Sequence, residues 1–204
     1  MSKNIFNIID CGVGGQGVVL MANIVGEACA RSGLNVVSGE LHGLSQRGGS
    51  VIAHQRIGQN VHSPLVPYGE ADVILSLEPM EALRYLFFLR DGGMVITNTK
   101  MDHPPLETQR IALKEKDAYV RYEDVVERIG STGARLVEID ALALSLKAGS
   151  AQTVNVVMVG ALAASPGFPV GKSMMLDAVK ENVPKKALDV NTKAFDLGYE
   201  SLSD

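Results

Sequence analysis

The N-terminal part of the chain constrains the fold more than any other stretch, because it places a strand, a glycine loop and a helix in succession. The apolar, β-branched run "NIFNIIDC" predicts a strand from about Ile5 to Cys11. The stretch "GVGGQG" follows, and "VVLMANIVGEACA" predicts a helix from Gly17 to Ser32. Such a unit opens many α/β proteins, in which the helix packs back on a parallel sheet.

The rest of the chain continues this alternation. Runs rich in β-branched residues predict further strands at residues 34–39, 50–57, 71–77, 92–99 and 134–140. Helical patterns occur at residues 79–89, 123–130, 141–147, 153–164, 173–182 and 188–198. Residues 101–116 are expected to form a loop with a short edge segment.

This order of elements predicts an α/β fold, a three-layer α/β/α sandwich with a mainly parallel sheet. The C-terminal segment, about residues 141–204, is expected to be helical, and to close over the ends of the strands or to pack on a partner. No repeat or linker divides the sequence, so residues 1–204 are expected to form a single domain. The strand at 50–57 is expected to have one accessible face, because His54 and Arg56 lie on the same side.

Composition excludes several classes of protein. The net charge of −4 over 204 residues gives no basic surface for nucleic acid and no polybasic membrane anchor. The most apolar window, "TVNVVMVGALAA", is too short to cross a membrane, and no signal peptide is apparent, so a cytoplasmic protein is expected. Cys11 and Cys29 are too few to hold an iron–sulfur cluster, and are expected to be buried, while each lone histidine is expected to make a structural hydrogen bond.

The first glycine loop fits the spacing of a dinucleotide-binding fingerprint. Gly12, Gly14 and Gly17 stand between a predicted strand and a predicted helix, with Glu40 near the end of the second strand as the acid for a ribose. The glycines could instead permit only a tight turn and close packing, or serve a different anion or a docking edge. Gln16 favours the last two alternatives, because a carboxamide there can bind a backbone or partner group.

A second loop, "SGELHGLSQRGGSV", is polar and glycine-rich although it lies between two good strands. It is expected to contact a ligand or a partner, with Arg47 binding a carboxylate or phosphate. None of the histidines has metal-ligand spacing, and no catalytic residue or metal ligand is assigned to the chain. The candidate contact residues of both loops are Gly12, Gly14, Gly15, Gln16, Gly17, His42, Ser45, Gln46, Arg47, Gly48 and Gly49.

Four segments together resemble a known family. The segments "GVGGQGVVLMANIVGEA", "GELHGLSQRGGSVIAHQRIG", "VHSPLVPYGEADVILSLEPMEALRYL" and "GGMVITNT" resemble the gamma-type domain of 2-oxoacid:ferredoxin oxidoreductases. The resemblance extends from Ile5 to Gly198, and the combination of "HGLSQRGG" with "VHSPL" is similar to the beta-type subunits of the indolepyruvate branch.

This resemblance implies a subunit of an enzyme that oxidatively decarboxylates an arylpyruvate with coenzyme A and passes electrons to ferredoxin. Thiamine diphosphate and iron–sulfur clusters would then belong to a large alpha subunit, and this chain would bind no cofactor alone. On that view Gly12 to Gly17 and His42 to Gly49 form one edge that faces the alpha subunit. Two other hypotheses stay open: a stand-alone nicotinamide-dependent oxidoreductase with a Rossmann site, and an interaction domain without catalytic contact.

Overall fold

A computed structural model describes residues 5–43, 48–102 and 120–203. The strands of the sheet are β1 (Ile5–Val13), β2 (Val36–His42), β3 (Ser50–Gly58), β4 (Ala71–Ser76), β5 (Leu89–Asn98) and β6 (Arg135–Ile139). The α-helices are α1 (Val18–Arg31), α2 (Pro79–Arg84), α4 (Tyr122–Gly130), α5 (Ala141–Ala148), α6 (Val154–Ala163), α7 (Lys172–Asn182) and α8 (Leu188–Ser203). Short 3₁₀ helices occur at η1 (Leu86–Phe88), η2 (Ala151–Thr153) and η3 (Lys185–Ala187).

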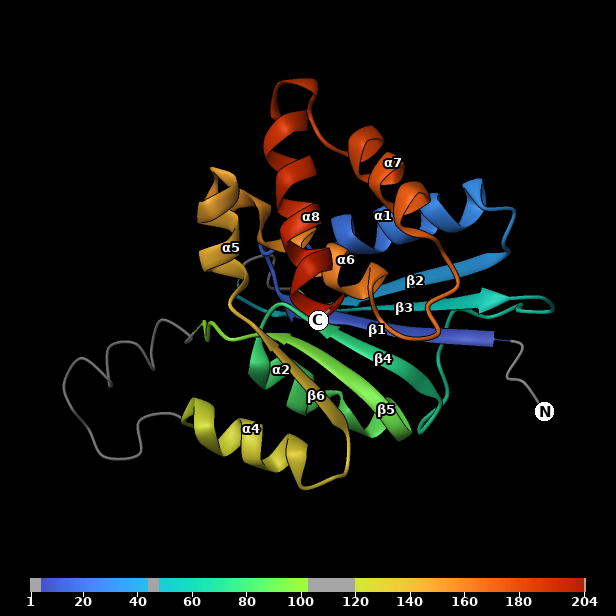
Figure 1. The fold of residues 1–204 in the computed structure, drawn as a ribbon. Helices are drawn as coiled ribbons and strands as arrows, with labels where there is room; N and C mark the ends of the chain where they lie inside the picture. Colours follow the sequence, from blue (N-terminus) through green and yellow to red (C-terminus); the bar gives the residue numbers. More distant parts are fainter. Residues whose placement is uncertain (1–4, 44–47, 103–119, 204) are drawn as a thin grey trace.

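The strands form one sheet in the order β2-β3-β1-β4-β5-β6. Strand β3 runs antiparallel to both of its neighbours, whereas β1, β4, β5 and β6 are parallel to one another. Helices α1, α5, α6, α7 and α8 cover one face, and α2 and α4 cover the other (Figure 1). The expected three-layer α/β/α sandwich with a mainly parallel sheet is therefore confirmed.

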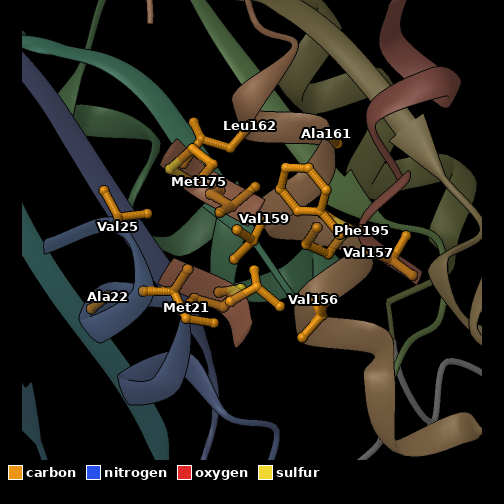
Figure 2. Packing of buried hydrophobic residues seen from close by; sticks show 14 of the residues in the cluster. Met21, Ala22, Val25, Val156, Val157, Val159, Ala161, Leu162, Met175 and Phe195 are labelled. Carbon is orange, nitrogen blue, oxygen red and sulfur yellow. The ribbon is translucent and has the colours of Figure 1, made fainter. Parts of the chain in front are cut away.

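The buried strands explain why the sequence patterns identified them. Every residue of β4 is buried, as expected for a continuous apolar run between two helical layers. The apolar core on the face of α1 joins this helix to α6, α7 and α8, and Figure 2 shows Met21, Met175 and Phe195 packed around α6. A second apolar cluster packs on the other face, and burial of such side chains is the dominant favourable contribution to folding.

Helices α6 and α8 approach unusually closely. A Cβ atom at Gly160 would overlap the carbonyl oxygen of Phe195, and one at Gly198 would overlap that of Val157. Only glycine lets two helix backbones touch in this way, and the contact places α6 between α8 and the sheet. The C-terminal segment is helical as expected. Its helix α6 packs on β4 and β5, and the start of α6 reaches the ends of the strands.

Two local expectations are wrong. The strand β3 has no open face over most of its length, because the segment after it folds back: the N–H of Val66 donates to Nδ1 of His54 over 3.2 Å, and Phe88 packs edge-on against the imidazole. The predicted helix at 79–89 ends at Arg84, and Leu89 already belongs to β5. The expected loop and edge segment at 101–116 fall mostly outside the described residues.

Candidate functional site

The first glycine loop lies where the carboxyl end of β1 meets the start of α1. Gly15 and Gly17 have φ angles of 100° and 92°, values that favour glycine. The N–H of Gln16 donates to the carbonyl of Val13 over 3.1 Å and closes the turn. Because the other parallel strands end at the same edge, this turn lies beside the segments that follow β4 and β5.

The outer glycines make room for two carboxamides. A Cβ atom at Gly12 would lie 2.6 Å from Oε1 of Gln16, and one at Gly17 would lie 2.5 Å from Nδ2 of Asn155 on α6. The glycines thus serve a turn and a close approach, as one of the sequence interpretations held. The groups that come close to these glycines are the polar side chains of Gln16 and Asn155, together with the apolar side chain of Leu77.

Gln16 ties the loop to the segment after β5. Its Oε1 accepts a hydrogen bond from the N–H of Val13 at 2.9 Å, and its Nε2 donates to Oδ2 of Asp102 at 2.5 Å. Asp102 also pairs with Lys100, whose Nζ lies 3.2 Å from Oδ1. Gln16 therefore binds a backbone group, as the sequence suggested it could. The two hydrogen bonds, one to each end of the carboxamide, fix the orientation of this side chain.

A cavity of about 380 Å³ opens beside this bridge. Polar groups line much of it, with Lys100 and Asp102 as its charged side chains. The lining residues are Gly15, Gln16, Gly17, Leu77, Asn98, Lys100, Asp102, Leu142, Ala151, Gln152, Val154 and Asn155. Amides donate and accept hydrogen bonds without a net charge, so this arrangement suits recognition of polar groups better than proton transfer.

The two predicted loops meet at the same edge. The N–H of Gly14 donates to the carbonyl of Gly49 over 2.8 Å, and the N–H of Gly48 donates to the carbonyl of Gly14 over 3.3 Å. His42 ends β2, where its backbone pairs with Val51 of β3. We call residues 12–17, 48–50, 77, 98–102 and 151–155 the carboxyl-end rim. Ser45, Gln46 and Arg47 lie outside the described residues.

Acidic side chains that the sequence interpretation missed support the rim from below. Glu78 and Glu81, at the start of α2, are 1% and 4% exposed. Glu78 accepts a hydrogen bond from the N–H of Glu81 at 2.9 Å, and Glu81 accepts from the hydroxyl of Ser50. The pair "Glu-Pro" after a buried strand was the available signal, because an acid before a proline suits the start of a helix.

Burial changes the ionisation of Glu78 and of Asp10, a second buried acid. It raises the pKa of Glu78 to about 7, although the N–H of Glu81 opposes the rise. It raises the pKa of Asp10 in β1 to about 7 as well, and a hydrogen bond from Nε2 of Gln55 opposes the rise only in part. One carboxyl oxygen of each acid has no hydrogen-bond partner in the structure. Both groups therefore exchange protons near neutral pH.

The cysteines and the histidine of β3 are structural. Cys11 and Cys29 are buried and free, and burial raises the pKa of the Cys29 thiol to about 12. Burial also lowers the pKa of His54, which accepts the hydrogen bond described above. Within residues 5–43, 48–102 and 120–203, no group of three or more histidine, cysteine or acidic residues could hold a metal ion.

The topology argues against a nicotinamide site at the glycine loop. In a dinucleotide-binding fold the acid that holds the ribose follows the strand beside β1. Here β3 lies between β1 and β2, and Glu40 is an exposed residue inside β2, paired with Ala53. The interpretation of Glu40 as a ribose ligand is therefore not supported, because a whole strand separates it from Gly12.

These features define a class of α/β domain whose polar rim gathers the carboxyl ends of the parallel strands β1, β4 and β5 and the start of the buried helix α6. The family model of pyruvate ferredoxin/flavodoxin oxidoreductase matches residues 7–201, so the chain belongs to that family. No helix within the described part of the chain is long and apolar enough to cross a membrane.

Relatives from archaea match along almost the whole chain. The chain is 42% identical over 98% of its length to "Indolepyruvate oxidoreductase subunit IorB" of Thermococcus kodakarensis, and covers 96% of that protein. It is 43% identical, with the same coverage, to the protein of that name from Pyrococcus horikoshii. A "Pyruvate/ketoisovalerate oxidoreductases common subunit gamma" of Thermococcus kodakarensis is 29% identical over 92% of each chain.

Solved structures show the same fold. The gamma subunit of a keto/oxoacid ferredoxin oxidoreductase from Geobacter sulfurreducens matches with a TM-score of 0.69 and 23% identity over 97% of this chain and 98% of that one. A pyruvate oxidoreductase subunit from Thermotoga maritima gives 0.73 and 22%, with 97% of each chain covered. A 2-oxoglutarate:ferredoxin oxidoreductase from Magnetococcus marinus also gives 0.73, at 18% identity, but only 31% of that longer chain corresponds to 98% of this one.

Proposed function

We propose that this chain is the small subunit of an indolepyruvate-type 2-oxoacid:ferredoxin oxidoreductase. The observation that carries the proposal is the similarity of more than 40% identity, along nearly the full chain, to two proteins named as subunits of indolepyruvate oxidoreductase. The carboxyl-end rim supports it, since polar groups and the two glycine loops converge there beside one cavity.

In the proposed reaction an arylpyruvate and coenzyme A yield an acyl-CoA and carbon dioxide. The two electrons released reduce two ferredoxin molecules by one electron each. Thiamine diphosphate, held by a larger alpha subunit, supplies the electron sink for decarboxylation, and iron–sulfur clusters conduct the electrons. This chain has two cysteines, both buried, so cluster ligands have to come from the partner.

In that reaction this chain shields the reacting groups from water and orients polar groups beside them. Gln16 is fixed between Val13 and Asp102, so its amide presents a rigid polar edge beside the cavity. The apolar side chains of Leu77 and Leu142 in the same lining exclude water from part of that surface.

We propose that Gly12, Gly14, Gly15, Gln16, Gly17, His42, Gly48 and Gly49 contact the alpha subunit or its ligands. Ser45, Gln46 and Arg47 remain predictions from the sequence. With its cysteines reduced, the complex is proposed to work in the cytoplasm.

The test is reconstitution under anaerobic conditions. This chain is combined with the candidate alpha subunit from the same source, recognised by thiamine-diphosphate and four-cysteine cluster motifs, and reduction of ferredoxin by indolepyruvate and coenzyme A is followed. We expect turnover only from the two chains together. Turnover by this chain alone, or equal turnover by the alpha subunit without it, would contradict the proposal. Arg47→Ala in the complex tests that residue, and unchanged kinetics and assembly would remove it from the site.

A further inference from the structure

The first turn of α2 carries two nearly buried glutamates directly beneath the rim. Glu78 and Glu81 are 1% and 4% exposed, and neither lines the cavity. A buried carboxylate is costly unless it forms ion pairs and hydrogen bonds, so each position calls for a specific partner. Glu78 is used locally, as the residue that caps α2.

The carboxylate of Glu81 reaches away from its own helix. It accepts a hydrogen bond from the hydroxyl of Ser50, the first residue of β3. On its other side Nε of Arg84 lies 3.1 Å from Oε1, and this arginine side chain is 55% exposed. The Oγ of Ser50 also lies 2.7 Å from the hydroxyl oxygen of Tyr85. A charged acceptor and a second hydroxyl therefore hold one serine side chain.

Ser50 is the point where the second loop enters the sheet. Immediately before it, Gly48 and Gly49 exchange backbone hydrogen bonds with Gly14 of the first loop. Residues 48–50 are thus held by hydrogen bonds from two elements, by the first glycine loop through the backbone and by α2 through the side chain of Glu81. Two adjacent glycines have large conformational freedom, so the bond to Glu81 limits where this segment can lie.

We propose that Glu81 is a positioning residue for the carboxyl-end rim, acting through Ser50 to fix residues 48–50 in the arrangement that meets the alpha subunit. The proposal rests on the proposed function, because it takes the rim as the contact surface. Glu81 itself does not line the cavity, and the bond to Ser50 links it to the second loop. A hydrogen bond to a carboxylate is about twice as strong as one between neutral groups, which suits a device that must hold a glycine-rich segment.

The alternative is that this bond only stabilises the fold. Both roles predict a lower melting temperature when it is removed, so stability does not separate them. A positioning role additionally predicts weaker assembly or slower turnover under conditions in which every variant is folded. It also predicts that Ser50 and Glu81 act through one another, so that their effects are not additive.

The experiment compares variants in the reconstituted complex, at a temperature at which circular dichroism shows all of them folded. Glu81→Met removes the acceptor and keeps the length of the side chain, and Ser50→Ala removes the donor. We expect each to raise the dissociation constant for the alpha subunit about tenfold, or to lower kcat about tenfold with KM less affected. The double variant should be no worse than the more affected single variant. Ser50→Thr, which keeps the hydroxyl, should restore most of the loss, and Glu81→Gln, which keeps a neutral acceptor, should restore about half of it.

Three results would overturn the inference. If Glu81→Met and Ser50→Ala lower the melting temperature but leave assembly and kinetics unchanged, the bond is only structural, whereas the proposed function stands. If the unmodified chain forms no complex with the alpha subunit, the proposed function fails and the inference fails with it. Fully additive losses in assembly would also contradict it, because they would show that Glu81 does not act through Ser50.

Discussion

Glycines bring groups into close contact in two regions of this molecule, with opposite consequences. Between α6 and α8, the missing Cβ atoms of Gly160 and Gly198 let one helix backbone touch the other. At the carboxyl-end rim, the missing Cβ atoms of Gly12 and Gly17 leave space for the ends of two amide side chains. A helix backbone cannot yield, whereas the end of a side chain can. The first region therefore stabilises the fold, and the second sets the direction of polar groups.

The largest effect is expected from Gly198→Ala. The added methyl group would overlap the carbonyl oxygen of Val157, so α8 must move away from α6 and disturb the core around Phe195. We expect a loss of about 3 kcal/mol in the free energy of unfolding, measured by denaturant titration.

The matched control is Gly26→Ala in α1, where no atom lies within 4 Å of the added Cβ. It should stabilise the protein by up to about 1 kcal/mol, because alanine has the higher helix propensity. Equal stability of the two variants would show that α6 and α8 separate without loss of stability, and would contradict the view that this contact is rigid.

A second prediction concerns Asp10, a polar residue within the apolar core. With its pKa raised from 3.8 to about 7, the folded chain keeps a proton that the unfolded chain releases. The contribution of this carboxyl to stability is complete below pH 4 and is lost as pH rises towards 7, at about 1.4 kcal/mol per pH unit.

Asp10→Asn should remove that slope, so that the variant gains about 2 kcal/mol in stability relative to the unmodified chain between pH 5 and pH 7. Thermal unfolding between pH 5 and 8 measures the effect. A slope from Glu78, whose pKa is also about 7, should remain in the variant. An unchanged slope would mean that Asp10 is ionised in the fold.

The smallest effect is expected at the rim. Gly12→Ala places a methyl group 2.6 Å from Oε1 of Gln16, and the amide must swing away and lose its bond to the N–H of Val13. We expect a loss of about 1.5 kcal/mol. In Gly12→Ala/Gln16→Ala the two losses should be less than additive by about 1 kcal/mol, since one clash is removed.

The corresponding double variant in the core, Gly198→Ala/Val157→Ala, should show no such relief. The group that blocks Gly198 is a backbone carbonyl, which truncation of the Val157 side chain leaves in place. Chemical denaturation measures both pairs. Losses in unfolding free energy that are less than additive in the core pair but additive in the rim pair would contradict this difference between the two regions.

Periodicity predicted much of the fold because the strands are buried in continuous runs. The six strands and the helical C-terminal segment follow from local patterns, and β4, buried throughout, is the clearest case. The end of α2 was missed because the stretch "YLFFL" that follows Arg84 has no charged residue, so helical periodicity gives no stop signal before η1. The covered face of β3 was missed because its cover is an irregular segment rather than a helix.

The site was only half predictable for a related reason. Glycine loops are recognisable from short local sequence patterns, so the edge at residues 12–17 and 48–49 could be predicted from the sequence. Their partners are distant: Gln16 and Asp102 are 86 positions apart, and Ser50 and Glu81 are 31 apart. Such pairs depend on strand order, and the placement of β3 between β1 and β2 follows from no local pattern.

Hydrogen–deuterium exchange of this chain, alone and in the reconstituted complex, shows whether the carboxyl-end rim meets the alpha subunit. We expect slower exchange at residues 12–17, 48–50 and 98–102 in the complex. We expect no change at the opposite edge of the sheet, at residues 33–35 and 58–60, which line a separate hollow with Ile5. Unchanged exchange at both glycine segments, with protection confined to that opposite edge, would contradict the proposed contact.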